Sequence, residues 1–300
     1  MIINVHDHPY DQKSGQILFQ FFAKFATERH LLDGTVVDRG GFVQSPEQSI
    51  KEMDEAGVGK TVILNTGPIP NEHIYEAYLK PYPDRFIGFT SSRPVLLEGN
   101  VMEVNAFNQK NWENTRYCLK ELGFTGIKLL PSYEHYSAVD PRVYPYYALA
   151  AELNVPITMH MAGTPVRFVS LCYAKPLDAD RVLFDFPTVR FNLPHMGWPW
   201  EDELLVMMIR ASNLYTDISQ LGETGLKRMA KALITARDYG VLSRVMFGTD
   251  PLCRPIKMYI DFIKNGINIV AAEQGERLFT KDEIDGILGK NAMRFLGIAS

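Results

Sequence analysis

Eight short apolar runs, separated by stretches with helix signals, constrain what this chain of 300 residues can fold into. Most of these runs are continuously apolar, which is typical of parallel strands that are covered on both faces. We therefore expect strands at Ile2–His6, Thr61–Asn65, Arg85–Thr90, Gly126–Leu130, Pro156–Met161, Arg190–His195, Leu214–Ile218 and Arg244–Gly248.

The stretches between the runs carry signals of helix starts and stops. Ser45 is a candidate cap followed by Pro46, and Asp140-Pro141 opens a stretch that ends at Leu153, before Asn154. The tail from Thr280 to Leu296 is expected to form a closing helix. Strands that alternate with helices in this way favour a closed (β/α)8 TIM barrel.

An open doubly wound sheet is the alternative architecture. It would normally place a glycine-rich phosphate loop after the first strand, whereas His-Asp-His-Pro follows here. We therefore expect one barrel domain over 1–300, with an insertion at 9–44 on the active-site side. Leu18, Phe21, Phe22 and Phe25 have helical spacing in that insertion and predict a helix on the barrel rim, with a substrate lid or a subunit contact as sharper interpretations.

Composition excludes several classes of partner. The hydrophobic content of 46% is that of a globular chain, and a net charge of -4 argues against nucleic acid. No apolar run approaches the ~20 residues that a membrane helix needs. The three cysteines are far apart and the first residues do not resemble a signal peptide, so we expect free thiols and a cytoplasmic protein.

Five potential metal ligands or proton carriers stand at the ends of predicted strands: His6, His8, His160, His195 and Asp250. Residues at the carboxyl ends of barrel strands gather around one mouth, where such folds place their chemistry. Imidazole and carboxylate groups are ligands for divalent ions such as zinc. His6 and His8 are two residues apart and would point to the same side of a strand.

Each of these residues also has a structural interpretation. His6 and His8 could be a hydrogen-bonded pair, and His160 could be a core histidine bonded to backbone. Asp250 could cap a helix before Pro251. Barrel closure nevertheless places the eighth strand beside the first, and therefore places Asp250 beside His6.

With these residues, the chain resembles the metal-dependent amidohydrolase superfamily, in the branch often called amidohydrolase family 2, which contains aminocarboxymuconate-semialdehyde decarboxylase. The resemblance spans nearly the whole chain. The segments that carry it are His6-Asp7-His8, Gly126-Ile127-Lys128-Leu129, His160, Pro194-His195-Met196-Gly197-Trp198, Phe247-Gly248-Thr249-Asp250 and Ile287-Leu288-Gly289-Lys290-Asn291-Ala292. Asp7 departs from the small or apolar residue usual there, and we expect it to face away from the metal.

The resemblance implies that His6, His8, His160 and Asp250 hold one divalent metal ion. His195 would then hydrogen-bond a water bound to that ion, and Asp250 would also relay a proton. We expect zinc first, while manganese or iron would accept the same ligands.

Further residues are candidates for substrate binding. Lys128 ends the fourth predicted strand and would contact a substrate carboxylate or have a structural role; in some relatives a lysine there is carbamylated and bridges two metals. Arg167, Tyr133, Trp198 and Arg254 are the other candidates. Arg167 could equally be a surface arginine, and Trp198 could equally pack at the rim.

Three functions follow. The first is a metal-dependent hydrolase that acts with metal-activated water on a small carbonyl-containing, carboxylate-bearing substrate. The second is a metal-dependent decarboxylase of an unsaturated or aromatic acid. The third is a barrel that binds a ligand without catalysis. A homodimer or larger homo-oligomer is compatible with all three.

Overall fold

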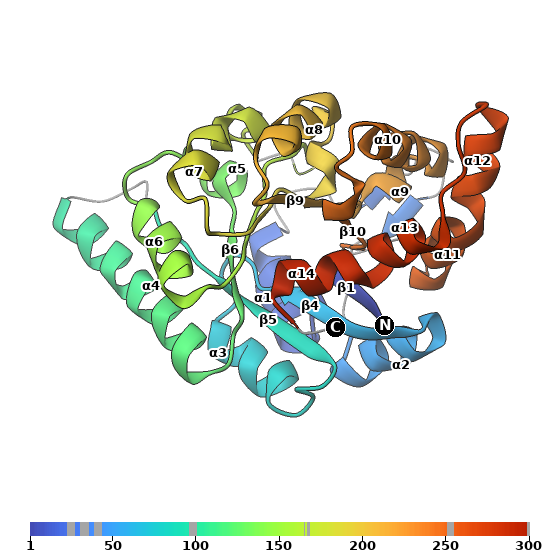
Figure 1. Ribbon diagram of the computed structural model, residues 1–300. Coiled ribbons are helices and arrows are strands. Elements are labelled where there is room, and N and C mark those ends of the chain that lie inside the picture. The colour runs from blue at the N-terminus through green and yellow to red at the C-terminus, as the bar shows by residue number, and fades with distance from the viewer. Residues whose placement is uncertain are drawn as a thin grey trace.

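The computed structural model describes residues 1–22, 28–30, 36–38, 44–95, 101–164, 166, 169–250 and 255–298, and the description covers no side chains in 18–22, 28–30, 36–38 or at 101. Its centre is an eight-stranded parallel sheet with helices outside it (Figure 1). The strands, in their order around the sheet, are β1 (Ile2–Asp7), β4 (Val58–Leu64), β5 (Phe86–Ser91), β6 (Gly126–Leu129), β7 (Ile157–Met159), β8 (Phe191–Asn192), β9 (Leu214–Asp217) and β10 (Val245–Met246).

Backbone hydrogen bonds bring the last strand back to the first. The N–H of Val5 in β1 donates to the carbonyl of Phe247, which directly follows β10, at 3.0 Å. The N–H groups of Thr249 and Asp250 donate to the carbonyl of His6 at 3.1 and 2.7 Å. The predicted (β/α)8 barrel is therefore confirmed, and all eight predicted strands are present with ends that differ by a few residues.

Helices surround this barrel, most of them on its outside (Figure 1). In chain order they are α2 (Pro46–Ala56), α3 (Asn71–Ile74), α4 (Val101–Glu121), α5 (Pro131–Glu134), α6 (Tyr144–Leu153), α7 (Asp180–Asp185), α8 (Glu201–Arg210), α9 (Leu221–Thr224), α10 (Leu226–Asp238), α11 (Ile256–Asp261), α12 (Ile267–Glu273), α13 (Lys281–Asp285) and α14 (Asn291–Leu296). Short 3-10 turns lie at Leu171–Tyr173, Pro176–Ala179, His195–Gly197 and Leu242–Arg244, and π turns at Tyr75–Leu79, Phe262–Gly266 and Gly286–Lys290.

Local sequence explains several helix boundaries. Ser45 and Gln48 form a reciprocal capping box at the start of α2, and Asn154 ends α6 in the left-handed region with φ 52°. α6 begins at Tyr144 rather than at the expected Pro141. A helix that started at Pro141 would carry Pro145 in its interior, where proline lacks the N–H that the helix needs.

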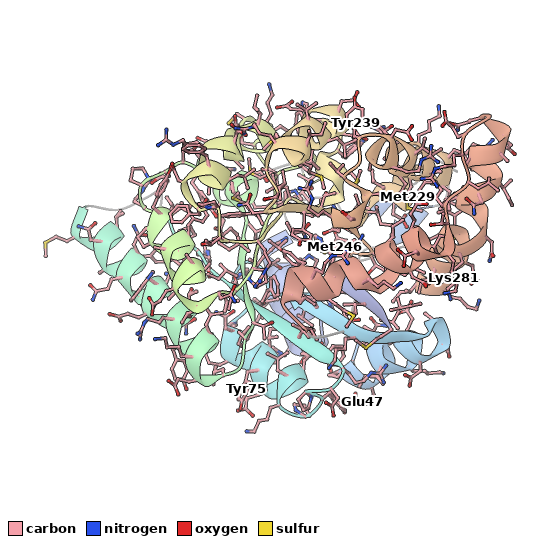
Figure 2. All side chains as sticks on the ribbon, in the orientation of Figure 1. Glu47, Tyr75, Met229, Tyr239, Met246 and Lys281 are labelled. Atoms are coloured by element: carbon pink, nitrogen blue, oxygen red, sulfur yellow. The ribbon has the colours of Figure 1, made fainter. Side chains whose placement is uncertain are left out.

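The interior of the barrel is apolar at the end away from the candidate site. Phe295 of α14 lies 6.2 Å from the ring of Phe89 in β5 and 5.3 Å from the ring of Tyr215 in β9. These strands lie on opposite sides of the barrel, so Phe295 closes its floor. Met246 is fully buried near the centre of the molecule, whereas Glu47 and Lys281 lie at its edge (Figure 2). The polar site at the other end therefore rests on a rigid base.

The insertion after β1 begins with the helix α1 (Gln12–Phe22), followed by a two-stranded antiparallel pair, β2 (Glu28–His30) and β3 (Val36–Asp38). The helical backbone agrees with the predicted helix. The side chains of Leu18, Phe21 and Phe22, and residue Phe25 as a whole, lie outside the described part of the chain. Among the described helices, none combines the length and the apolar character needed to span a membrane.

Candidate metal centre

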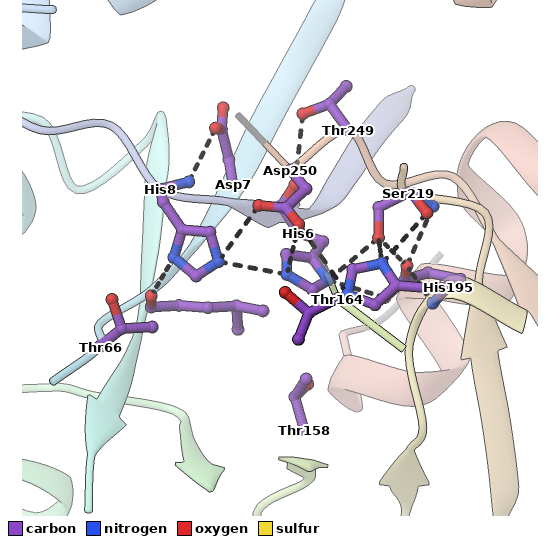
Figure 3. Close-up of polar contacts among 12 residues, drawn as sticks. His6, Asp7, His8, Thr66, Thr158, Thr164, His195, Ser219, Thr249 and Asp250 are labelled. Atoms are coloured by element: carbon purple, nitrogen blue, oxygen red, sulfur yellow. Dashed lines mark hydrogen bonds and ion pairs between the residues drawn. The ribbon is translucent and has the colours of Figure 1, made fainter. Parts of the chain in front are cut away.

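Three histidines and one aspartate meet at the carboxyl ends of the strands. His6 lies in β1 and His8 just beyond it, His195 follows β8, and Asp250 follows β10. The structure therefore brings Asp250 to the same rim as His6, across the seam where the barrel closes (Figure 3). His6 and His195 are buried, and Asp250 exposes only 16% of its side chain.

The distances among these groups are those of ligands around one ion. His6 Nε2 lies 3.2 Å from His8 Nε2, and Asp250 Oδ1 lies 3.5 Å from His8 Nε2. Asp250 Oδ2 lies 4.0 Å from His6 Nε2 and 3.8 Å from His195 Nε2. Ligand atoms about 2.1 Å from a tetrahedral zinc ion lie about 3.4 Å from one another, which matches the two shorter contacts.

Hydrogen bonds at the opposite ring nitrogens indicate where the imidazole protons lie. His8 Nδ1 faces the carbonyl oxygen of Leu64 at 2.6 Å, and His6 Nδ1 faces Asp217 Oδ2 at 3.1 Å. Both partners accept, so each Nδ1 carries a proton and donates it. The two Nε2 atoms that face each other at 3.2 Å are therefore both unprotonated, and each directs a lone pair at the other. A cation between them would relieve the repulsion of the two lone pairs.

His160 provides a second indication of a missing ligand. Its side chain is buried, and its Nε2 has no hydrogen-bond partner among the described residues. Its ring lies 5.0 Å from the ring of His195. Buried polar atoms are nearly always paired, so an orphaned imidazole nitrogen beside the cluster suits a metal ligand. The ligand atoms of His6, His8 and Asp250 all lie within 4.8 Å of one another, and His160 is not part of that close group.

The backbone around the cluster adopts a conformation that ordinary residues rarely take. Asp250 and His195 have φ angles of 58° and 61°. A positive φ in residues other than glycine is uncommon and gathers at functional sites, where surrounding contacts enforce it. Asp250 does not cap α11, which begins at Ile256, so its strained conformation serves the orientation of its carboxylate. Gly248 has a related function, since a Cβ there would lie 2.9 Å from the Cβ of His6.

Burial controls the charges in the cluster. Burial lowers the pKa of His8 to about 3 and that of His195 to about 4, so both imidazoles are neutral at pH 7. Burial works against ionisation of Asp250, but the attraction of His6, His8 and His195 outweighs it and holds the pKa below the usual range. The site thus presents neutral nitrogen lone pairs and one carboxylate, which is the donor set that zinc or manganese accepts.

Asp217, at the end of β9, is the residue that sequence reasoning missed. Besides His6, its carboxylate accepts hydrogen bonds from Asn192 Nδ2 at 2.8 Å, from the backbone N–H of His195 at 3.3 Å and from the Ser219 hydroxyl. The Ser219 hydroxyl in turn lies 2.8 Å from His195 Nδ1. A single acid inside an apolar strand, Leu214–Ile218, was the available signal.

Three of the five proposed substrate-binding residues lie in the described part of the chain, each in a different environment. Lys128 is 1% exposed on β6, and its ammonium group has no hydrogen bond or ion pair among the described residues. Tyr133 lies with its ring 5.0 Å from His160, edge on, and its hydroxyl 2.8 Å from Thr164 Oγ1. Trp198 packs at the rim, where the Arg228 guanidinium lies 5.8 Å from its ring. Arg167 and Arg254 lie outside the described residues.

Other residues near the cluster support its backbone. The N–H of His8 donates to Asp7 Oδ1 at 2.8 Å, in agreement with the expectation that Asp7 supports neighbouring backbone. Tyr10 stacks on His8, with ring centroids 6.0 Å apart, and its hydroxyl lies 2.9 Å from Thr66 Oγ1. An aromatic ring thus flanks the site on each side, Tyr10 at His8 and Tyr133 at His160.

Comparison with known proteins places this architecture among recognised relatives. The model of the amidohydrolase family matches residues 43–298. The chain is 35% identical over 95 residues to 2-keto-4-carboxy-3-hexenedioate hydratase from Sphingobium sp., a match that covers 27% of this chain and 28% of that protein.

Among the solved structures that resemble the whole chain, two serve as examples. One is 4-oxalomesaconate hydratase from Rhodopseudomonas palustris, with 17% identity and a TM-score of 0.65 over 99% of this chain and 96% of that one. The other is a variant of 5-carboxyvanillate decarboxylase from Novosphingobium aromaticivorans with bound manganese, with 14% identity and a TM-score of 0.68 over 99% and 97% of the two chains. At these identities the likeness shows the shared barrel fold.

Proposed function

The chain belongs to the amidohydrolase family, and from that premise we propose that it binds one divalent metal ion through His6, His8, His160 and Asp250 and adds water to a small unsaturated acid. The observation that carries the proposal is the pair of facing lone pairs on His6 and His8, 3.2 Å apart beside the Asp250 carboxylate. His160, with its unpartnered Nε2, would supply the fourth ligand. Zinc and manganese both suit this set, and the decarboxylase named above holds manganese.

A divalent ion bound at this place would supply positive charge that polarises a substrate carbonyl and lowers the pKa of a water molecule to about 7. His195 would be the residue that takes a proton from the attacking water. Burial keeps its imidazole neutral, and its Nδ1 is engaged by Ser219, so Nε2 offers a lone pair toward the cluster. A neutral buried histidine in this position serves as general base and can return the proton later.

Lys128 and Tyr133 would hold the substrate. The Lys128 ammonium is buried at the end of β6 without a counter-ion in contact, so a substrate carboxylate would complete its pairing. Tyr133 has its hydroxyl fixed by Thr164 and presents its ring beside His160, where it would limit the substrate to a flat group. Arg167 and Trp198 remain predicted substrate contacts.

Water addition and hydrolysis use the same nucleophile, and the 35% identical segment of a hydratase favours addition for this chain. In that reaction the water oxygen bonds to one carbon of a C=C bond conjugated to a carbonyl. The π electrons of that bond then take up a proton at the neighbouring carbon, and His195 is placed to take and return it. No bond of the carbon skeleton breaks, and the product contains one more water than the substrate.

Decarboxylation is the second candidate, because a buried ammonium such as that of Lys128 could hold the carboxylate that departs as CO2. Hydrolysis, addition and decarboxylation share every proposed metal ligand, so the three reactions must be distinguished by their products.

We further propose that the partner of this chain is a small molecule and that the protein acts in the cytoplasm, in agreement with its charge and its cysteine content.

The test uses the metal-loaded protein with 2-keto-4-carboxy-3-hexenedioate in water labelled with oxygen-18. We expect loss of the conjugated absorbance and one labelled oxygen in a new hydroxyl group, measured by mass spectrometry, with no release of CO2. Release of CO2, with no labelled hydroxyl group in the organic product, would show decarboxylation in place of water addition. A substrate that stays unchanged at full metal loading would reject this substrate class, and the His195→Ala variant provides the blank.

A further inference from the structure

We infer that Asp217 is a positioning residue that fixes the proton on Nδ1 of both His6 and His195, and so aims both Nε2 lone pairs at the same place. This inference rests on the proposed function, since it assigns a role to Asp217 in the same site. Asp217 is fully buried on β9 and touches both imidazole-bearing segments, which lie far apart in the sequence.

The first step of the argument is the count of donors around Asp217. Oδ1 accepts from the backbone N–H of His195, the backbone N–H of Ser219 at 3.1 Å and the Ser219 hydroxyl. Oδ2 accepts from Asn192 Nδ2 at 2.8 Å and from His6 Nδ1 at 3.1 Å. Five donors converge on one carboxylate, and a carboxylate can only accept, so His6 must carry its proton on Nδ1.

The second step concerns Ser219. Its hydroxyl proton is directed to Asp217, so its oxygen can only accept from the ring nitrogens next to it. His195 Nδ1 lies 2.8 Å from that oxygen and 3.1 Å from the Ser219 carbonyl oxygen, two acceptors. The proton of His195 therefore also lies on Nδ1. Asp217 sets this arrangement indirectly, because it accepts the hydroxyl proton that Ser219 could otherwise have donated to His195.

The chemical consequence is that one acid serves both a proposed ligand and the proposed base. A hydrogen bond from the remote ring nitrogen orients a metal-bound histidine and makes it a better ligand. The same Ser219 oxygen lies 3.2 Å from His6 Nδ1, so the two rings share one hydrogen-bonded support. Their centroids are 4.9 Å apart, which keeps the lone pair of His195 next to the ligand that His6 supplies.

The sharpest variant is Asp217→Asn, which preserves shape but replaces one acceptor with a donor. The three donors at Oδ1 would retain the amide oxygen on their side, so the amide NH2 would face His6 Nδ1. Two donors would then oppose each other, and His6 would move its proton to Nε2, the atom that should bind the ion. We expect zinc affinity to fall about 10–100-fold, which is the usual cost of losing such a partner.

Zinc affinity is measured by competition with a chelating dye, on variants whose thermal midpoints are recorded alongside. Ser219→Ala should cost less zinc affinity than Asp217→Asn, because Asp217 still accepts from Nδ1 of the ligand His6. Asp11→Asn is the matched control: Asp11 also pairs with a histidine, His73, at 2.9 Å, but away from the cluster. Asp11→Asn should keep the wild-type zinc affinity.

Nitrogen-15 spectra of the zinc-loaded wild-type histidines test the inference without any variant, and should show protonated Nδ1 on both His6 and His195. Protonated Nε2 on either ring, or an Asp217→Asn variant that folds and binds zinc as tightly as the wild type, would overturn the assignment while leaving the proposed function intact. A wild-type protein that binds no zinc or manganese would instead reject the proposed function.

Discussion

A His160→Ala variant is expected to lose its metal ion, whereas a His195→Ala variant is expected to keep the ion and lose activity. His160 has a buried Nε2 with no hydrogen-bond partner among the described residues, as suits an atom that binds an ion. His195 lies beside Asp250 but is held through Nδ1 by Ser219, as suits a proton carrier. Loss of a general base typically slows a reaction by about 10²–10⁴-fold.

The two variants are compared for metal content by elemental analysis and for turnover under saturating metal. The His160→Ala variant should contain much less metal than the wild type and should recover part of its activity at high added metal. The His195→Ala variant should have full metal content, and added metal should not restore its activity. Equal metal content in both variants would contradict the roles assigned to the two histidines, because His195 would then be as much, or as little, a ligand as His160.

A Lys128→Met variant is expected to fold more stably than the wild type and to bind substrate more weakly. Burial lowers the pKa of Lys128 from its usual 10.5 to about 8, although Asp250 and Asp217 attract its charge. The difference between the two pKa values corresponds to roughly 3 kcal/mol of unfavourable burial at pH 7. Methionine fills a similar volume without a charge, so its free energy of unfolding should be higher by an amount of that order.

The sign of the pH dependence follows from the lowered pKa. Below pH 8 the lysine is protonated in both the folded and the unfolded chain, and the folded protein bears the full cost of burying the charge. Between about pH 8 and 10.5 the folded form releases its proton first, so the cost disappears as pH rises. The stability advantage of Lys128→Met should therefore be largest at pH 7 and shrink toward pH 10, measured by urea unfolding.

The substrate side of the same variant separates function from structure. Losing a hydrogen bond to a charged group costs about 1.5–3 kcal/mol, so KM for a carboxylate substrate should rise by at least tenfold. A variant that is less stable than the wild type, with an unchanged KM, would show that Lys128 is a structural residue. Two metal ions per wild-type chain would point instead to a modified lysine that bridges them.

Much of the fold could be predicted from the sequence, because parallel strands buried on both faces leave an unmistakable apolar pattern. The position of the site followed from the same pattern, since His6, His8 and Asp250 stand at strand ends and barrel closure brings them to one rim. The start of α6 was misplaced because two prolines, Pro141 and Pro145, both fit a helix start. Only the completed structure shows that the later one is used.

The partners of the site could not be predicted in the same way. Asp217 and Ser219 matter through contacts with residues more than 20 positions away, and those contacts depend on strand register. The bond from His8 Nδ1 to the Leu64 carbonyl leaves no trace in residue type, since every residue has a carbonyl. The sequence therefore indicated which groups are present at the mouth, while their proton positions required the folded chain.

The metal content of the wild-type protein, purified without chelators, tests the central claim most directly. The account predicts about one equivalent of zinc or manganese per chain, and predicts its loss when His6 or His8 is replaced by alanine, because their facing nitrogens hold it. A protein that binds neither ion, even when supplied in excess, would contradict the account and leave a barrel that binds its ligand without a metal.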